Sequence, residues 1–156
     1  MGGMGGGYLA TAGNRPREDI MKFRNLFAAF FLLCAGLCNG VMDSLQFHYP
    51  QTVFSDAKRF EPQFWNPAES WKNKYRNGDP RQGEKFFGSS TALVFVTDAW
   101  HLFKFLMLKF FILAAVVFLP FTRKLGHEWW QVWLYNTLGF VALHLCFQAG
   151  FKLAYV

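Results

Sequence analysis

The chain has 156 residues, of which 53% are hydrophobic and 20% aromatic, and its formal net charge is +6 at neutral pH. Its apolar residues are gathered into three long runs, whereas a soluble domain of this length scatters them with a helical or strand period. The three cysteines fall within apolar runs and read as buried side chains, which argues against a disulfide framework. The composition therefore predicts an all-α, polytopic membrane protein with one transmembrane domain over residues 21–156.

The beginning of the chain allows two interpretations. Residues 1–20 are glycine-rich and then polar, which predicts a disordered tail. The first helix is expected over about residues 26–47, but its strictly apolar part ends at Cys38 and is only about 13 residues long, as in a secretory signal peptide. Retention as a transmembrane helix is favoured because the apolar character continues beyond Cys38, around a polar stripe. The apolar residues that continue it are Val41, Met42, Leu45 and Phe47.

Two further helices are expected over residues 92–120 and 129–152. At about 1.5 Å per residue, each exceeds the roughly 20 residues that cross a bilayer. A short polar turn from Pro120 to Glu128 separates them, which predicts an antiparallel helical hairpin. The chain would therefore have three transmembrane helices.

The loop over residues 48–90 is the only large extramembrane part. Prolines and glycines interrupt it often enough that only short helices fit. Its aromatic side chains alternate with lysine and arginine, as expected of a segment lying in the headgroup layer and contacting membrane lipids. The same mixture occurs in nucleic-acid-binding proteins, but anionic lipid already accounts for it, so we expect no nucleic-acid partner.

Basic residues give the expected orientation. The amino-terminal flank carries Arg15, Arg17, Lys22 and Arg24, and the turn between the last two helices carries Arg123 and Lys124. The positive-inside rule would place both on the cytoplasmic side, although the long loop is equally basic. We expect the amino terminus inside, the loop outside, and a multi-pass location in a cell inner membrane.

Five ionisable residues lie in or at the edge of the three apolar runs, and chain direction puts all five toward one membrane face: Asp43, His48, Asp98, His101 and His144. Charge at membrane depth is costly and usually marks a function. Counting from a turn centred near Lys124, His101 and His144 should differ in depth by only roughly 5 Å. The five side chains would then line one polar pocket.

Imidazoles together with carboxylates are typical ligands of zinc or another divalent metal that keeps an open position for water. Asp98, His101 and His144 are the predicted metal ligands, and Asp43 or His48 would act as a general base or a further ligand. The Asp98-x-x-His101 spacing puts both side chains on one helix face. The pattern predicts a metal-dependent hydrolase or a related lipid-active enzyme.

The sequence also allows other functions for these residues. His101 and His144 could be the axial ligands of a b-type haem, or Asp98, His101 and Lys109 could form a proton or ion pathway in a homo-oligomer. In the plainest alternative each side chain satisfies a local partner. The protein would then be a non-enzymatic accessory or structural subunit that binds other membrane subunits.

Three strings carry a resemblance to a known group of proteins. They are Asp43-Ser-Leu-Gln-Phe-His48, Phe64-Trp-Asn-Pro67 with Trp71-Lys-Asn-Lys-Tyr75, and Thr97-Asp-Ala-Trp-His-Leu-Phe-Lys104. These resemble stretches of small, uncharacterised bacterial integral membrane proteins, over roughly the middle half of the chain. The resemblance implies a bacterial membrane setting and no particular activity.

Overall fold

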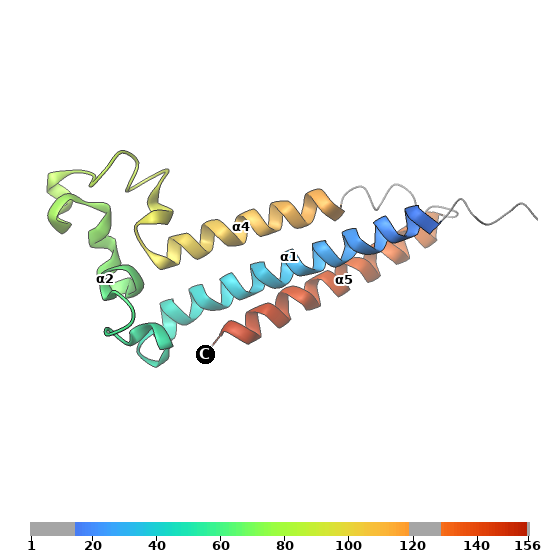
Figure 1. The fold of residues 1–156 in the computed structure, drawn as a ribbon, viewed down its shortest axis with the longest axis horizontal. Coiled ribbons are helices and arrows are strands. Elements are labelled where there is room, and N and C mark those ends of the chain that lie inside the picture. Colours follow the sequence, from blue (N-terminus) through green and yellow to red (C-terminus); the bar gives the residue numbers. More distant parts are fainter. Residues whose placement is uncertain (1–14, 119–128, 156) are drawn as a thin grey trace, which may run out of the picture.

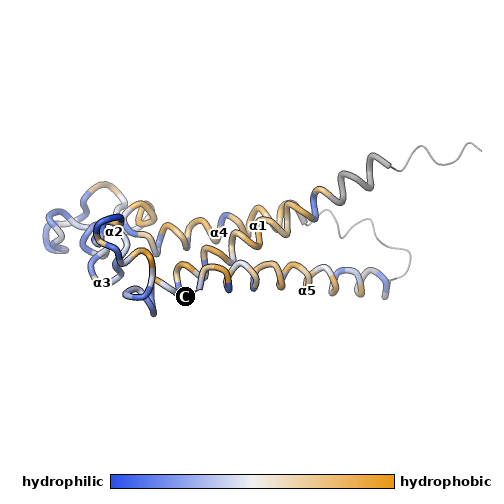
Figure 2. Tube along the Cα trace, turned by 60° about the horizontal axis from the view of Figure 1, so that its bottom comes forward, coloured by the Kyte–Doolittle hydropathy of each residue, from blue (hydrophilic) through white to orange (hydrophobic). Residues whose placement is uncertain are grey.

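The computed structural model describes residues 15–118 and 129–155 as three long helices lying side by side, with a cap of short helices at one end (Figure 1). Within these residues three segments are long and apolar enough to cross a membrane, which confirms the all-α class with three candidate transmembrane helices. The helices are mostly hydrophobic and the cap is mostly hydrophilic (Figure 2). The long helices are α1 (Arg15–His48), α4 (Ala99–Phe118) and α5 (Trp129–Ala154).

The first helix, α1, is the centre of the bundle. It packs extensively against both α4 and α5, whereas the backbones of α4 and α5 rarely approach each other, although Phe111 of α4 stacks on Phe147 of α5. Helices α4 and α5 run in opposite directions, as predicted, but α1 lies between them, so they do not pack as a close hairpin (Figure 1). The predicted turn at 120–128 lies outside the described residues. Cleavage of α1 as a signal peptide would remove the surface on which both other helices pack, which favours its retention.

Glycines allow α1 and α5 to approach closely. A Cβ atom added at Gly36 or Gly40 would lie within 3.0 Å of backbone atoms of α5, and one added at Gly150 would meet the backbone of α1. Gly36 and Gly40 are spaced as in the small-xxx-small patterns that bring transmembrane helices together. Near the cap, the Ser44 hydroxyl donates to the Ala154 carbonyl at 3.1 Å. Gly36 and Gly40 thus belong to a helix-packing surface of α1.

The helix boundaries differ from expectation at two places. Helix α1 begins at Arg15, well before the expected residue 26. Its start therefore lies inside the predicted disordered tail. Residues 1–14 of that tail lie outside the described part. Helix α4 begins at Ala99 instead of residue 92, since Val94–Val96 is a separate 3₁₀ turn (η6). The apolar run continued through this segment, so hydrophobicity alone did not reveal the break.

Between α1 and α4, the cap contains only short helices, as predicted. Several begin at proline, whose fixed φ suits a first helical position. A cluster of aromatic rings organises the cap: Phe54 stacks on Trp65 with centroids 4.3 Å apart, Phe60 meets Trp65 edge-on, and Trp65 reaches Phe103 of α4. The short helices are η1 (Tyr49–Gln51), η2 (Val53–Ser55), α2 (Pro62–Trp65), α3 (Pro67–Ser70), η3 (Trp71–Lys74), η4 (Arg76–Gly78) and η5 (Pro80–Gln82).

At the other end of the bundle, Arg24 ties α1 to α4. Its Nη2 donates to the carbonyl of Val117 at 2.8 Å, and its Nε to the same oxygen at 3.3 Å. Carbonyls in the last turn of a helix have no partner within the helix, and a positive charge there complements the helix dipole. Arg24 therefore fixes the end of α4 opposite the cap.

The glycine contacts generate a stability prediction. Gly36→Ala should lower the free energy of unfolding in detergent micelles by about 3 kcal/mol, because its methyl group meets backbone that cannot move aside. Ala149→Val, which also enlarges a side chain of this helix pair but at an exposed position, is the control and should change stability little. Thermal or denaturant unfolding measured by tryptophan fluorescence reports both, and equal effects would contradict the packing.

Candidate functional site

Asp98 lies at the junction of the cap and α4, and its side chain is 3% exposed. Its Oδ1 accepts the backbone N–H of His101 at 2.9 Å, so Asp98 caps the amino terminus of α4. The Nδ1 atom of His101 lies 2.8 Å from both carboxylate oxygens. Because an ionised carboxylate only accepts hydrogen bonds, Nδ1 carries the proton and donates. The predicted Asp98–His101 pair therefore exists, on the helix face that the spacing implied.

Two groups of the cap hold this junction in place. The Lys74 Nζ atom lies 3.9 Å from Oδ2 of Asp98 and compensates its charge. The amide of Asn73 donates to the carbonyls of Gln63 and Thr97, which joins two parts of the cap directly beside Asp98. Sequence reasoning missed both residues, since nothing in the local pattern of a basic loop distinguishes one lysine or asparagine from its neighbours.

A pocket of about 250 Å³ opens beside the pair. Ser70, Trp71 and Lys74 of the cap line one side, and Asp98, Trp100 and His101 line another. With Nδ1 held by Asp98, the Nε2 atom of His101 is the ring nitrogen left to accept a proton or bind a ligand. No hydrogen bond to Nε2 is found in the described part of the chain. The pocket thus offers a carboxylate-oriented imidazole, a lysine and two indole rings at one membrane face.

Glu84 organises the part of the cap that precedes α4. Its carboxylate accepts hydrogen bonds from the Ser90 hydroxyl, the Gly88 N–H and the Ser90 N–H. These bonds, that of the hydroxyl first, lower the pKa of Glu84 from its ordinary value. Glu84 was not a predicted site residue, and its role is to close a turn at Gly88, where φ is +76°.

The remaining predicted site residues lie elsewhere. His48 Nε2 is 2.8 Å from the hydroxyl of Tyr155 at the end of α5, so it joins α1 to the carboxyl terminus of α5. Asp43 is partly buried on α1, with no hydrogen-bond partner found for its side chain within residues 15–118 and 129–155. Neither residue lines the pocket beside Asp98 and His101.

His144 is exposed on α5, where its Nε2 lies 3.4 Å from the amide of Gln148. It precedes Phe147 by three residues, and Phe147 packs on Gly36, so His144 is level with about residue 32 of α1. At that level Phe31 stacks on Phe110 of α4, nine residues beyond His101. The two histidines therefore differ in depth by at least about 14 Å instead of the roughly 5 Å expected. The count from the turn failed because α1, and not a tight hairpin, sets the register of α5.

Three or more candidate ligands do not come together anywhere in the described residues: no group of His, Cys, Asp and Glu there could hold a metal ion. Asp98 and His101 form a pair, but His144 does not join them. The same separation removes the geometric basis for a haem held between His101 and His144, since both axial ligands must lie at one depth.

Comparison with known proteins adds no assignment. No protein-family profile, curated protein or solved structure matches the chain.

The capping role of Asp98 can be tested separately from any chemistry. Asp98→Ala should destabilise the protein by about 3 kcal/mol, because it removes both an N-cap and the partner of His101. Asp98→Asn should lose less, since asparagine also caps helices. Hydrogen exchange of the His101 amide should accelerate in Asp98→Ala, whereas Asp56→Ala, at an exposed aspartate of the cap, should leave it unchanged. Unaltered exchange in Asp98→Ala would refute the cap.

Glu84 gives a pH prediction. Because its pKa is lowered in the folded protein, the ionised carboxylate stabilises the turn above the ordinary value of 4.5, and this contribution is lost as the pH falls through the lowered pKa. Carbon-13 NMR of the carboxyl group should give a titration midpoint below 4.5. Ser90→Ala should raise it, while Ser55→Ala, which removes a cap hydroxyl bonded only to carbonyls, should not. A midpoint insensitive to Ser90 would contradict the assigned cause.

Proposed function

We propose that this protein is a non-enzymatic accessory subunit of a larger assembly in a bacterial inner membrane, docked through the outer surface of α4. The observation that carries the proposal is Lys109. It lies near the middle of the candidate span Ala99–Val117, and its side chain is exposed. A lysine in that position faces either acyl chains or another protein.

The energetics favour another protein. Placing lysine at the centre of a transmembrane helix costs about 2.5–3.5 kcal/mol on insertion scales. The Lys109 Nζ atom lies 5.0 Å from the centre of the Phe105 ring, one turn toward the cap, and this contact offsets only part of that cost. The apolar side chains around it, Leu108, Ile112 and Val116, are also exposed. Together they form a surface with one charge at its centre, which suits a partner helix that brings an aspartate or glutamate to the same depth.

A second copy of this chain is a poor source of that carboxylate. Asp43 is the acidic residue of the span Phe23–Gln51. Lys109 is level with about residue 32 of α1, so Asp43 lies roughly 16 Å nearer the cap. Two copies inserted with the same orientation could not bring these side chains together. The partner is therefore a different polypeptide.

The Asp98–His101 pair favours a second candidate, a lipid-active hydrolase. An imidazole held by a carboxylate at 2.8 Å is the arrangement that activates water or a hydroxyl as general base. In that function His101 would be the base and Lys74 would meet a phosphate or an oxyanion in the pocket. A metal-dependent version would need ligands beyond Asp98 and His101. We rank it second because Asp98 already has a structural role in capping α4.

The accessory role predicts that Lys109 is required for a contact inside the membrane. A photo-reactive amino acid at position 112 should crosslink to one discrete protein in native membranes, and Lys109→Met should reduce that product at least about tenfold, because the paired carboxylate loses its counter-ion. Lys104→Met is the matched control, since Lys104 is also exposed on α4 but lies nearer the cap, over the Trp100 ring. It should preserve the crosslink.

Two kinds of result would count against the accessory role. One is a crosslink to lipid alone, or a protein crosslink that Lys109→Met leaves intact. The other is hydrolysis of phospholipids by purified protein that His101→Gln abolishes without loss of folding, or stoichiometric bound metal that is lost in His101→Ala. Such hydrolysis, or such bound metal, would select the hydrolase.

A further inference from the structure

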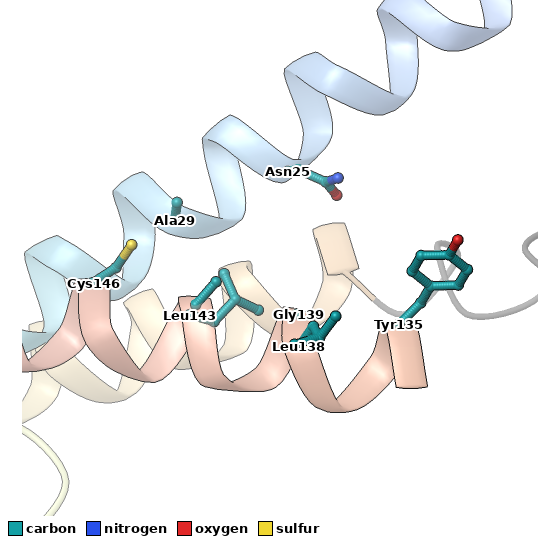
Figure 3. Close-up of a pocket in the computed structure, with 8 residues that line it drawn as sticks. Asn25, Ala29, Tyr135, Leu138, Gly139, Leu143 and Cys146 are labelled. Atoms are coloured by element: carbon teal, nitrogen blue, oxygen red, sulfur yellow. The ribbon is translucent and has the colours of Figure 1, made fainter. Parts of the chain in front are cut away.

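A second cavity, of about 390 Å³, lies between α1 and α5 at the end of the bundle away from the cap. Its lining is almost entirely apolar, and small residues create the space: Ala29 on α1, and Gly139 and Ala142 on α5. Asn25 and Tyr135 stand at one end and Cys146 at the other (Figure 3). Asn25, Tyr135 and Leu138 are exposed, so the cavity is a groove open to the surroundings of the bundle.

The groove has the length of one lipid leaflet. Tyr135 lies at the beginning of the span Trp133–Ala154, and Cys146 is eleven residues further along α5, about 16 Å away. Half of a hydrocarbon core is about 15 Å thick. A chain that enters at the polar end, beside Asn25 and Tyr135, would therefore end near the middle of the bilayer, where the glycine contacts of α1 and α5 close the space.

The polar end of the groove also has a suitable charge. The sequence of α1 up to this point carries four basic residues and two acidic ones over positions 15–24. The last basic residue is Arg24, which precedes Asn25. Arg24 donates from Nε and Nη2 to the carbonyl of Val117, and its remaining N–H groups can donate to another acceptor. Excess positive charge at the interface attracts anionic headgroups.

We propose that this groove binds one acyl chain of an anionic phospholipid, with the headgroup beside Asn25 and the basic first turns of α1. The apolar walls hold the chain, and the net positive charge selects the headgroup. The site lies on a different surface from Lys109, so it stands or falls independently of the partner helix on α4.

Lipid retention tests the proposal. Protein from nanodiscs with equal phosphatidylglycerol and phosphatidylcholine, released into detergent and weighed by native mass spectrometry, should retain one phospholipid, mostly phosphatidylglycerol. Ala142→Phe should lower retention about tenfold, since its ring fills the groove. Ala149→Phe, the same change at a position of α5 that does not line the groove, should not. Gly139→Leu is a second variant that fills the groove, should the first fail to fold.

Three outcomes would overturn the inference. Unchanged retention in both folded groove variants would show that lipid binds elsewhere. Equal retention of the two phospholipids, or no loss of selectivity in a combined Arg17→Gln and Lys22→Gln variant, would remove the headgroup preference. A protein crosslink from position 138 that Ala142→Phe abolishes would show that a partner helix occupies the groove.

Discussion

The close contact between α1 and α5 sets the positions of most other groups in this molecule. Three glycines allow the two backbones to touch, and a side chain at any of them would force the helices apart. This contact makes α1 the central helix and sets the depth of every residue on α5. It places Ala154 beside Ser44, Tyr155 beside His48, and His144 far from the cap. The set of α5 side chains that lie near the cap therefore depends on how these glycines pack.

The two ends of the molecule have different roles in this arrangement. At the cap, Asp98 joins the extramembrane segment to α4 through His101 and Lys74, and the aromatic cluster around Trp65 holds the segment against the helix. At the opposite end, Arg24 holds the last turn of α4, and small residues leave an apolar groove between α1 and α5. Between them lies Lys109, an exposed charge that neither end satisfies. The hydrophilic cap (Figure 2), the apolar groove and the exposed lysine are the features from which the accessory role is proposed.

Much of the fold could be predicted from the sequence. Long apolar runs identified the three helices, and the observed bounds of α5, Trp129–Ala154, agree closely with the predicted ones, because Trp129 and Trp130 mark a membrane interface. The Asp98–His101 pair followed from helical spacing, since contacts three residues apart depend only on local geometry. The start of α4 could not be derived, because the apolar run continues upstream of the residue that caps it.

The convergence of Asp98, His101 and His144 could not be judged in the same way. The depth of His144 relative to His101 depends on which helices pack together, and the sequence of a polar turn does not decide this. The distance between spin labels at positions 101 and 144 in lipid bilayers, measured after replacement of the three native cysteines, tests the arrangement most directly. Continuous-wave EPR covers short separations and pulsed EPR covers long ones. The glycine-based register predicts a distribution centred beyond about 14 Å. A distribution below about 10 Å would contradict it and return the two positions to one depth.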